Sequence, residues 1–248
     1  MRLVAGVVHD GEFIGRWLGL TPDICPDQGL TPTADELAFV PEPPPTSAAY
    51  IGRIEPDSGI QIYIDAVEIL AGNMKRQFHL DVYGDGSLLP SLRKRVDRAD
   101  LPVTFHGRVA NAQDRVVEAC FAFIDGRMAI QEAMARRRLV LAGYTDPLKR
   151  DYVAGELFSP HIVTVSNGAE LADQVAYYID HPDKRHALIE RAYLHARTLT
   201  WPRTAEAYTS LWAKHLASRT PRQSRWEFLK TALLLNHEAS TAKTTWAP

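Results

Sequence analysis

The chain has 248 residues, of which 46% are apolar and 23% charged, and its formal net charge is −2. This composition is that of a globular protein with a sizeable core, and it excludes a strongly basic surface, so a nucleic-acid partner is not expected. The two cysteines, Cys25 and Cys120, form no CxxC or metal-spaced cluster, which favours a reducing compartment over a disulfide scaffold. A signal-peptide pattern is lacking and no apolar run approaches a membrane span, so a cytoplasmic location is expected.

The chain divides into three zones. Residues 1–45 form a short leader with loop-like composition, and it ends in the proline-rich stretch PEPPP at residues 41–45. Such a stretch is typical of a hinge between folded units. We therefore expect a leader and hinge at residues 1–45, a folded domain at residues 46–217, and a basic, mildly amphipathic tail at residues 218–248.

Within the folded domain, short apolar segments alternate with helical patterns. The predicted strands cover residues 48–54, 78–84, 102–107, 120–124, 139–144 and 161–166. The first helical pattern repeats an apolar side chain every three or four residues, at Ile60, Ile64, Val67 and Ala71. Most connections leave no room for a hairpin and contain a helix. The sequence therefore predicts an α/β fold, a Rossmann-like doubly wound parallel sheet of about six strands followed by C-terminal helices.

Glycine-bearing turns follow the first four predicted strands. They read GRIEPDSG, GDGS, HGRV and DGRM. In a parallel sheet, ligands bind outside the carboxyl ends of the strands, where helix N-termini offer free N–H groups and a positive dipole end. None of these turns reads GxGxxG or GxxxxGK[ST], so the dinucleotide fingerprint and the P-loop are both absent from the sequence. The pattern favours a phosphate-bearing ligand that is bound by loops other than these two known phosphate-binding motifs.

Four segments, taken in order, resemble one protein family. YIGRIEPDSG, LDVYGDGSL, VTFHGRV and AIQEAMARRRLVLAGYTDPLKRDY are similar to segments of the C-terminal, nucleotide-sugar-binding domain of family 4 (group 1) glycosyltransferases, which have the GT-B fold. The similarity is greatest to a branch in which a GYLAILEAMA-like segment is followed by YDNPLKRDY. It covers residues 48–217.

The resemblance implies a donor site at the strand ends. A sugar nucleotide needs a cation or helix N-terminus for its diphosphate and an acceptor for its ribose hydroxyls. Glu132 corresponds to the family glutamate that binds the ribose, and Arg53 corresponds to the phosphate-binding arginine. The backbone N–H groups of Gly126, Arg127 and Met128 are expected to face the diphosphate. The alternatives are a glutamate on an exposed helix face and a solvated turn arginine.

Two departures from the family pattern bear on this site. Ser58 stands where the family has a lysine, so a hydroxyl replaces one cationic contact to phosphate. Ile124 stands where a first glutamate contacts the donor sugar, with Asp125 as the nearest carboxylate, so recognition of the sugar must differ. Lys149 and Arg150 follow a predicted strand, where they can reach a phosphate or an acidic acceptor.

Further candidates lie at the periphery of the site. Gly84 and Asp85 are expected to shape a nearby turn, with Asp85 acting as a turn or cap residue rather than as a ligand. His106, which precedes Gly107 at the end of the third strand, is the candidate histidine for the cleft, and a buried or capping histidine is the favoured alternative. The arginines at residues 136–138 are expected to form a solvated helix end rather than to close the site electrostatically.

The resemblance implies a retaining glycosyltransferase that moves a sugar from a nucleotide sugar to a glycan or lipid acceptor, as in polysaccharide biosynthesis, without a metal or a cofactor. Residues 1–45 are too short for the acceptor domain of a GT-B enzyme. We therefore expect a half-enzyme that is truncated or completed by a separate chain carrying the N-terminal domain.

Two other functions stay open from the sequence. The chain can be a non-catalytic module that senses a nucleotide sugar, which the residues at Ser58 and Ile124 favour. It can also be a decayed interaction domain whose tail, with Trp226, Phe228 and Leu229, contacts a protein or the periphery of a membrane. Sugar transfer or donor hydrolysis by the purified chain would argue against the first alternative, and a stable monomer with no lipid or protein partner would argue against the second.

Overall fold

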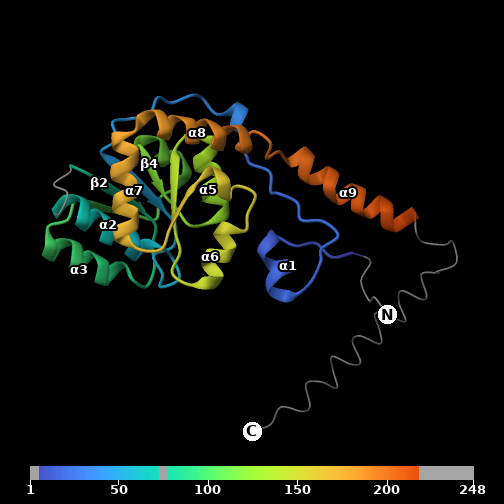
Figure 1. Cartoon of the computed structure of the whole chain (residues 1–248), viewed down its shortest axis with the longest axis horizontal. Coiled ribbons are helices and arrows are strands. Elements are labelled where there is room, and N and C mark those ends of the chain that lie inside the picture. Colours follow the sequence, from blue (N-terminus) through green and yellow to red (C-terminus); the bar gives the residue numbers. More distant parts are fainter. Residues whose placement is uncertain (1–5, 73–76, 218–248) are drawn as a thin grey trace, which may run out of the picture.

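A computed structural model describes residues 6–72 and 77–217 of the chain. Its strands form one parallel sheet in the order β3-β2-β1-β4-β5-β6 (Figure 1). The strands are β1 (Ser47–Ile51), β2 (His79–Tyr83), β3 (Val103–Gly107), β4 (Phe121–Phe123), β5 (Leu139–Gly143) and β6 (Val163–Val165). The prediction of a doubly wound, Rossmann-like parallel sheet is confirmed, because the order runs outward from β1 in one direction and from β4 in the other.

Helices cover both faces of this sheet (Figure 1). The helix α2 packs against α7, and α5 packs against α8. The helices of the domain are α2 (Ile60–Gly72), α3 (Leu89–Ala99), α4 (Ala112–Arg115), α5 (Arg127–Ala135), α6 (Pro147–Ala154), α7 (Gly168–Asp180), α8 (Pro182–Ala196) and α9 (Trp201–Ala217), with 3-10 turns η2 (Val116–Glu118) and η3 (Ser159–His161). In Figure 1, α9 extends away from the sheet.

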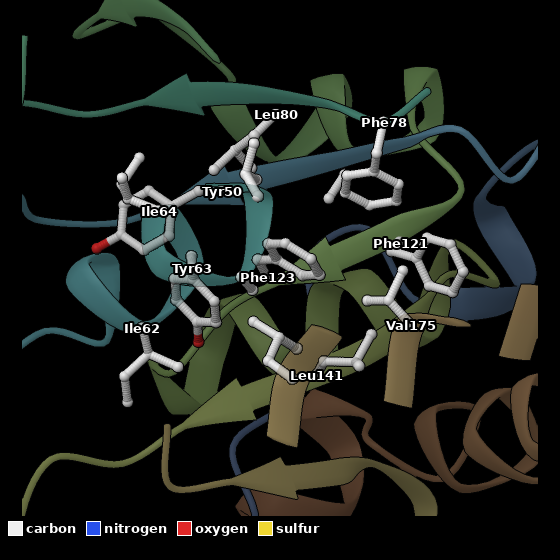
Figure 2. Packing of buried hydrophobic residues seen from close by; sticks show 14 of the residues in the cluster. Tyr50, Ile62, Tyr63, Ile64, Phe78, Leu80, Phe121, Phe123, Leu141 and Val175 are labelled. Atoms are coloured by element: carbon white, nitrogen blue, oxygen red, sulfur yellow. The ribbon is translucent and has the colours of Figure 1, made fainter. Parts of the chain in front are cut away.

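Aromatic side chains fill the core beneath α2. Tyr63 stacks on Phe123 with ring centroids 5.2 Å apart, and Phe78 lies 6.0 Å from Phe123 (Figure 2). The Tyr63 hydroxyl accepts a hydrogen bond of 2.9 Å from the Gly143 N–H, so this buried polar group is paired. Strands covered on both faces need apolar side chains in both directions, which explains why β4 and β5 are apolar without alternation.

The leader contains structure that its composition does not predict. The helix α1 (Glu12–Leu18) and the turn η1 (Ala34–Glu36) lie within it. The expectation of a loop is therefore wrong for residues 12–18, where Gly11 (φ 122°) precedes the helix and Gly19 (φ 63°) ends it in left-handed backbone that glycine adopts readily. The predicted tail at residues 218–248 lies outside the described residues.

The proline-rich stretch is anchored to the domain rather than free. The Glu42 carboxylate accepts hydrogen bonds of 3.0 and 3.1 Å from the buried guanidinium of Arg185, and it lies 3.0 Å from the ring of His186. The Cys120 thiol donates to the same carboxylate at 3.2 Å. A paired carboxylate of this kind fixes where the leader enters β1.

The arginine run that follows α5 is largely buried. Arg138 is 1% exposed, and Arg136 is 9% exposed and pairs with Asp114 at 2.7 Å. The Arg138 guanidinium donates to the carbonyl oxygens of Val40 and Val117, among others. The expectation of a solvated helix end is therefore wrong for both arginines, because the leader and η2 bring carbonyl oxygens to Arg138 and α4 brings the Asp114 carboxylate to Arg136.

Candidate functional site

A cavity of about 490 Å³ lies where the strand order reverses, outside the carboxyl ends of β1 and β4. The helices that follow these two neighbouring strands, α2 and α5, turn to opposite faces of the sheet, which leaves a crevice between them. The cavity is lined by Asp10, Gln28, Ile51, Gly52, Arg53, Ser58, Asp125, Gly126, Arg127, Met128, Ala129, Lys149 and Tyr152.

The loop after β1 holds Arg53 at the rim of the cavity. The Tyr50 hydroxyl donates to the Arg53 carbonyl oxygen at 2.5 Å, and the Ile54 N–H donates to the Asp85 carbonyl oxygen at 2.9 Å. The Arg53 side chain is 70% exposed and pairs with Asp57 at 2.8 Å. Because a guanidinium has five donors, this single pairing leaves donors for an anion.

The turn after β2 supports that loop without lining the cavity. A Cβ atom on Gly84 would lie 1.9 Å from the Gly52 carbonyl oxygen, so only glycine allows the two loops to pack this closely. The Asp85 carboxylate accepts a 2.8 Å hydrogen bond from the Gly86 N–H and so acts as a turn residue.

The helix α5 presents its N-terminus to the cavity. Its N-cap is Gly126, which has no capping side chain. The Arg127 N–H donates to the Tyr152 hydroxyl at 2.9 Å and is therefore occupied. The first turn of α5 can therefore offer a ligand the N–H groups of Met128 and Ala129. The positive end of the helix dipole lies at the same place. Of the three predicted backbone contacts, the one from Arg127 is thus already used within the protein.

The Arg127 side chain holds the leader. It is 7% exposed, forms an ion pair with Asp10, and lies 3.6 Å from Asp27 and 3.4 Å from Glu156. Burial raises the pKa of the Glu156 carboxyl to about 7; Arg127 opposes this change, and Asp27 and Asp10 add to it. The positive charge of Arg127 is therefore balanced inside the protein.

Two groups of opposite charge meet in the cavity. The Lys149 ammonium lies 3.1 Å from the Asp125 carboxylate, which also accepts a 3.0 Å hydrogen bond from the Gly59 N–H. The Ser58 hydroxyl lines the cavity, but its proton is used within the protein, because it donates to the Glu55 carbonyl oxygen at 2.8 Å.

Glu132 lies beyond the cavity wall, toward α4. Its side chain is half-buried on α5 and is not among the lining residues. Burial raises the pKa of the Glu132 carboxyl; Arg136 opposes this change and Asp114 adds to it. Within the part of the chain that the structure describes, no group donates a hydrogen bond to this carboxylate. The structure therefore does not bring Glu132 together with Arg53, and it leaves the Glu132 carboxylate outside the cavity with no hydrogen-bond donor among the described residues.

Three other predicted residues lie outside the cavity. The ring of His106 stacks on Tyr83 with centroids 4.5 Å apart, and its Nε2 atom lies 2.7 Å from the Asp81 carboxylate. Gly107 ends β3 at φ 72°. The Arg150 side chain pairs with the Asp151 carboxylate. Their roles in ligand binding, like those of the lining residues, stay predictions.

The cavity also contains groups that sequence reasoning missed. Asp10 and Gln28 come from the leader, and Tyr152 comes from α6. No motif in the sequence indicates that these segments meet. They meet because the ion pairs of Arg127 with Asp10 and Asp27 hold the leader at the cavity. Asp125 could have been found from the sequence, because it is the carboxylate nearest to Ile124, the position at which the family has a glutamate that contacts the donor sugar.

The described residues hold neither a metal-binding cluster nor a membrane-spanning helix. No group of three or more His, Cys, Asp or Glu side chains among them could hold a metal ion. The helices in this part of the chain are all too short or too polar to cross a membrane.

The family model of the glycosyl transferases group 1 matches residues 40–195. This chain belongs to that family. The resemblance predicted from the four sequence segments is thereby confirmed for the family as a whole. No curated protein matches the sequence.

Solved structures with a similar fold include those of TarM, HepE and the GtfA/B complex. TarM has a TM-score of 0.59 at 15% identity, with 71% of this chain and 37% of TarM covered. HepE from Anabaena, in complex with UDP and glucose, has a TM-score of 0.54 at 17% identity, with 70% of this chain and 48% of HepE covered. The GtfA/B complex has a TM-score of 0.58 at 15% identity, with 76% and 39% covered. This chain therefore spans less than half the length of each, and the likeness establishes the fold.

Proposed function

We propose that this chain binds a nucleotide-sugar donor in the switch-point cavity and forms the donor half of a retaining GT-B glycosyltransferase. The observation that carries the proposal is the cavity itself, where the N-terminus of α5 faces Arg53 across the junction of β1 and β4. A helix N-terminus beside an exposed guanidinium is suited to a diphosphate. Family membership and the UDP and glucose bound to HepE support this choice of ligand.

The bound donor is proposed to run along α5. Its diphosphate lies at the N–H groups of Met128 and Ala129, next to Arg53, and its ribose lies toward Glu132. Support for the second contact comes from the half-buried Glu132 carboxylate, to which no described group donates a hydrogen bond. Asp10 from the leader supplies an acceptor for sugar hydroxyls at the other end.

The proposed chemistry is transfer with retention at the anomeric carbon. The bond between this carbon and the diphosphate oxygen breaks, and the acceptor hydroxyl bonds to the same face while its proton passes to the departing diphosphate. Negative charge grows on the diphosphate during this step, so groups fixed around it stabilise the transition state more than the ground state. In this chain those groups are Arg53 and the first turn of α5.

The acceptor is proposed to be a glycan or a lipid, held by a second Rossmann-like domain in the same polypeptide or in a partner chain. Support comes from the solved relatives, of which this chain covers 37% for TarM and 39% for GtfA/B, the latter a complex. We also propose membership of the branch with the GYLAILEAMA-like segment, on the basis of residues 129–135 and 144–152.

The first test is binding of UDP-, GDP-, ADP- and dTDP-sugars, with the free nucleotides as controls, followed by thermal unfolding. One nucleotide class should stabilise the wild type by about 2.7 kcal/mol at 100 times its dissociation constant. Arg53→Gln should weaken its binding about tenfold, because one charge-assisted contact to phosphate is lost. Arg98→Gln, an exposed arginine of α3, serves as the matched control. A folded wild type that no nucleotide stabilises would remove the proposal.

The second test addresses the ribose contact. Glu132→Ala should weaken binding of the preferred nucleoside diphosphate about tenfold but leave binding of its 2′-deoxy counterpart nearly unchanged, because the lost acceptor serves a ribose hydroxyl. Calorimetric titration with both nucleotides measures the ratio, and Glu206→Ala, an exposed glutamate of α9, is the control. An equal loss for both nucleotides would assign Glu132 to another part of the ligand or to the fold.

A further inference from the structure

Three basic side chains line the cavity, and they differ in how far neighbouring carboxylates neutralise their charge. Arg127 faces three carboxylates, those of Asp10, Asp27 and Glu156, and is 7% exposed. Arg53 stands at the rim, with one exposed carboxylate beside it. Each phosphate of a nucleotide-sugar diphosphate carries a negative charge, so Arg53 alone leaves half of that charge without a cation. Lys149 is the remaining basic side chain among the lining residues.

Lys149 is fixed in position before any ligand arrives. Its backbone N–H donates to the Asp146 carboxylate at 2.9 Å, which caps α6 and sets the direction of the side chain. Its ammonium lies 3.1 Å from Asp125 and 5.2 Å from the centre of the Tyr152 ring. The side chain is 23% exposed, so little rotamer freedom is left to lose on binding.

The partner of Lys149 does not exhaust its donors. An ammonium has three N–H groups, and Asp125 faces one side of it. Asp125 is 6% exposed and is itself held by the Gly59 N–H, so it anchors the lysine from beneath. The other N–H groups of Lys149 are available to the cavity. This arrangement differs from that of Arg127, whose partners surround it.

Resting on the proposed function, we propose that Lys149 binds the donor diphosphate as the second cation opposite Arg53, and that Asp125 positions it. Arg53 comes from the loop after β1 and Lys149 from α6, which follows β5, so the two cations flank the N-terminus of α5 from either side of the strand reversal. Lys149 thereby replaces, from a different element, the lysine absent at Ser58. Two separated cations match two phosphates, so the substrate class is nucleoside-diphosphate sugars rather than nucleoside-monophosphate sugars.

The experiment compares a nucleoside diphosphate with its own monophosphate. The diphosphate among UDP, GDP, ADP and dTDP that stabilises the wild type is titrated calorimetrically at several salt concentrations. Lys149→Gln should weaken diphosphate binding about tenfold, change monophosphate binding less than threefold, and flatten the salt dependence of the diphosphate, because one screened charge contact is gone. Lys149→Arg should restore most of the affinity. Lys184→Gln, an exposed lysine of α8, is the matched control.

The possible results separate this proposal from the one on which it rests. A wild type that binds no nucleotide removes the proposed function itself. A wild type that binds, with Lys149→Gln of equal affinity, leaves the donor site in place and overturns the role of Lys149. An equal loss of monophosphate and diphosphate affinity, or a loss that Lys149→Arg does not recover, also overturns it, since charge on the second phosphate would not be what Lys149 senses.

Discussion

Replacing Arg138 with methionine should lower the free energy of unfolding by about 3–5 kcal/mol. The Arg138 side chain is 1% exposed, and its guanidinium donates to the carbonyl oxygens of Val40, Pro41 and Val117 at 3.4, 3.2 and 2.8 Å. Methionine fills similar space but donates nothing, so these carbonyl oxygens would lose the buried donor that holds them. Replacing a buried charged side chain by an apolar one costs little stability only where its partners are replaced as well. The partners of Arg138 are backbone carbonyl oxygens, which the substitution does not remove.

Urea unfolding followed by circular dichroism measures this loss. Arg98→Met provides the matched control, because the same substitution at an exposed site of α3 should change stability by less than about 0.5 kcal/mol. Limited proteolysis adds a local readout, since a leader no longer held by Arg138 should be cut near residues 41–45. A loss below about 1 kcal/mol with uncut leader would show that Glu42 and its partner Arg185 anchor this stretch on their own.

The sheet could be predicted because local patterns determine it. Each strand is a short apolar run, and each connection has helical periodicity, so the α/β class follows from neighbouring residues alone. The arginine run at residues 136–138 shows where such reasoning ends. Three arginines after a helix are usually solvated, and Arg138 is buried because Val40 and Pro41, distant in sequence, bring carbonyl oxygens to it.

The residues of the candidate site likewise include some that the sequence predicts and others that it does not. Arg53, Gly126 and Met128 follow closely after the ends of strands, and their place in the cavity follows from the rule for parallel sheets. Lys149 and Arg150 were indistinguishable in sequence, and the cap at Asp146 that sets the start of α6 decides which one faces the cavity. The contribution of the leader could not be predicted, since it depends on buried ion pairs between segments more than a hundred residues apart.

The buried Glu156 carboxyl, which lies beside Arg127, makes the stability of the protein depend on pH. Its carboxyl has a pKa raised from 4.5 to about 7, mainly by burial, so the folded protein keeps a proton that the unfolded chain releases. The stability from this group is complete below pH 4.5 and is lost as the pH rises to about 7, which amounts to at most about 3 kcal/mol. Glu156→Gln copies the protonated form and should recover that amount at pH 8.

Unfolding free energies of the wild type and Glu156→Gln, measured from pH 4 to pH 8, test this directly. The two proteins should be equally stable at pH 4 and diverge above it, with the variant more stable, whereas Glu206→Gln, an exposed change on α9, should follow the wild type throughout. If the unfolding free energies of Glu156→Gln and the wild type changed with pH in parallel, Arg127 would compensate the buried charge of Glu156 fully.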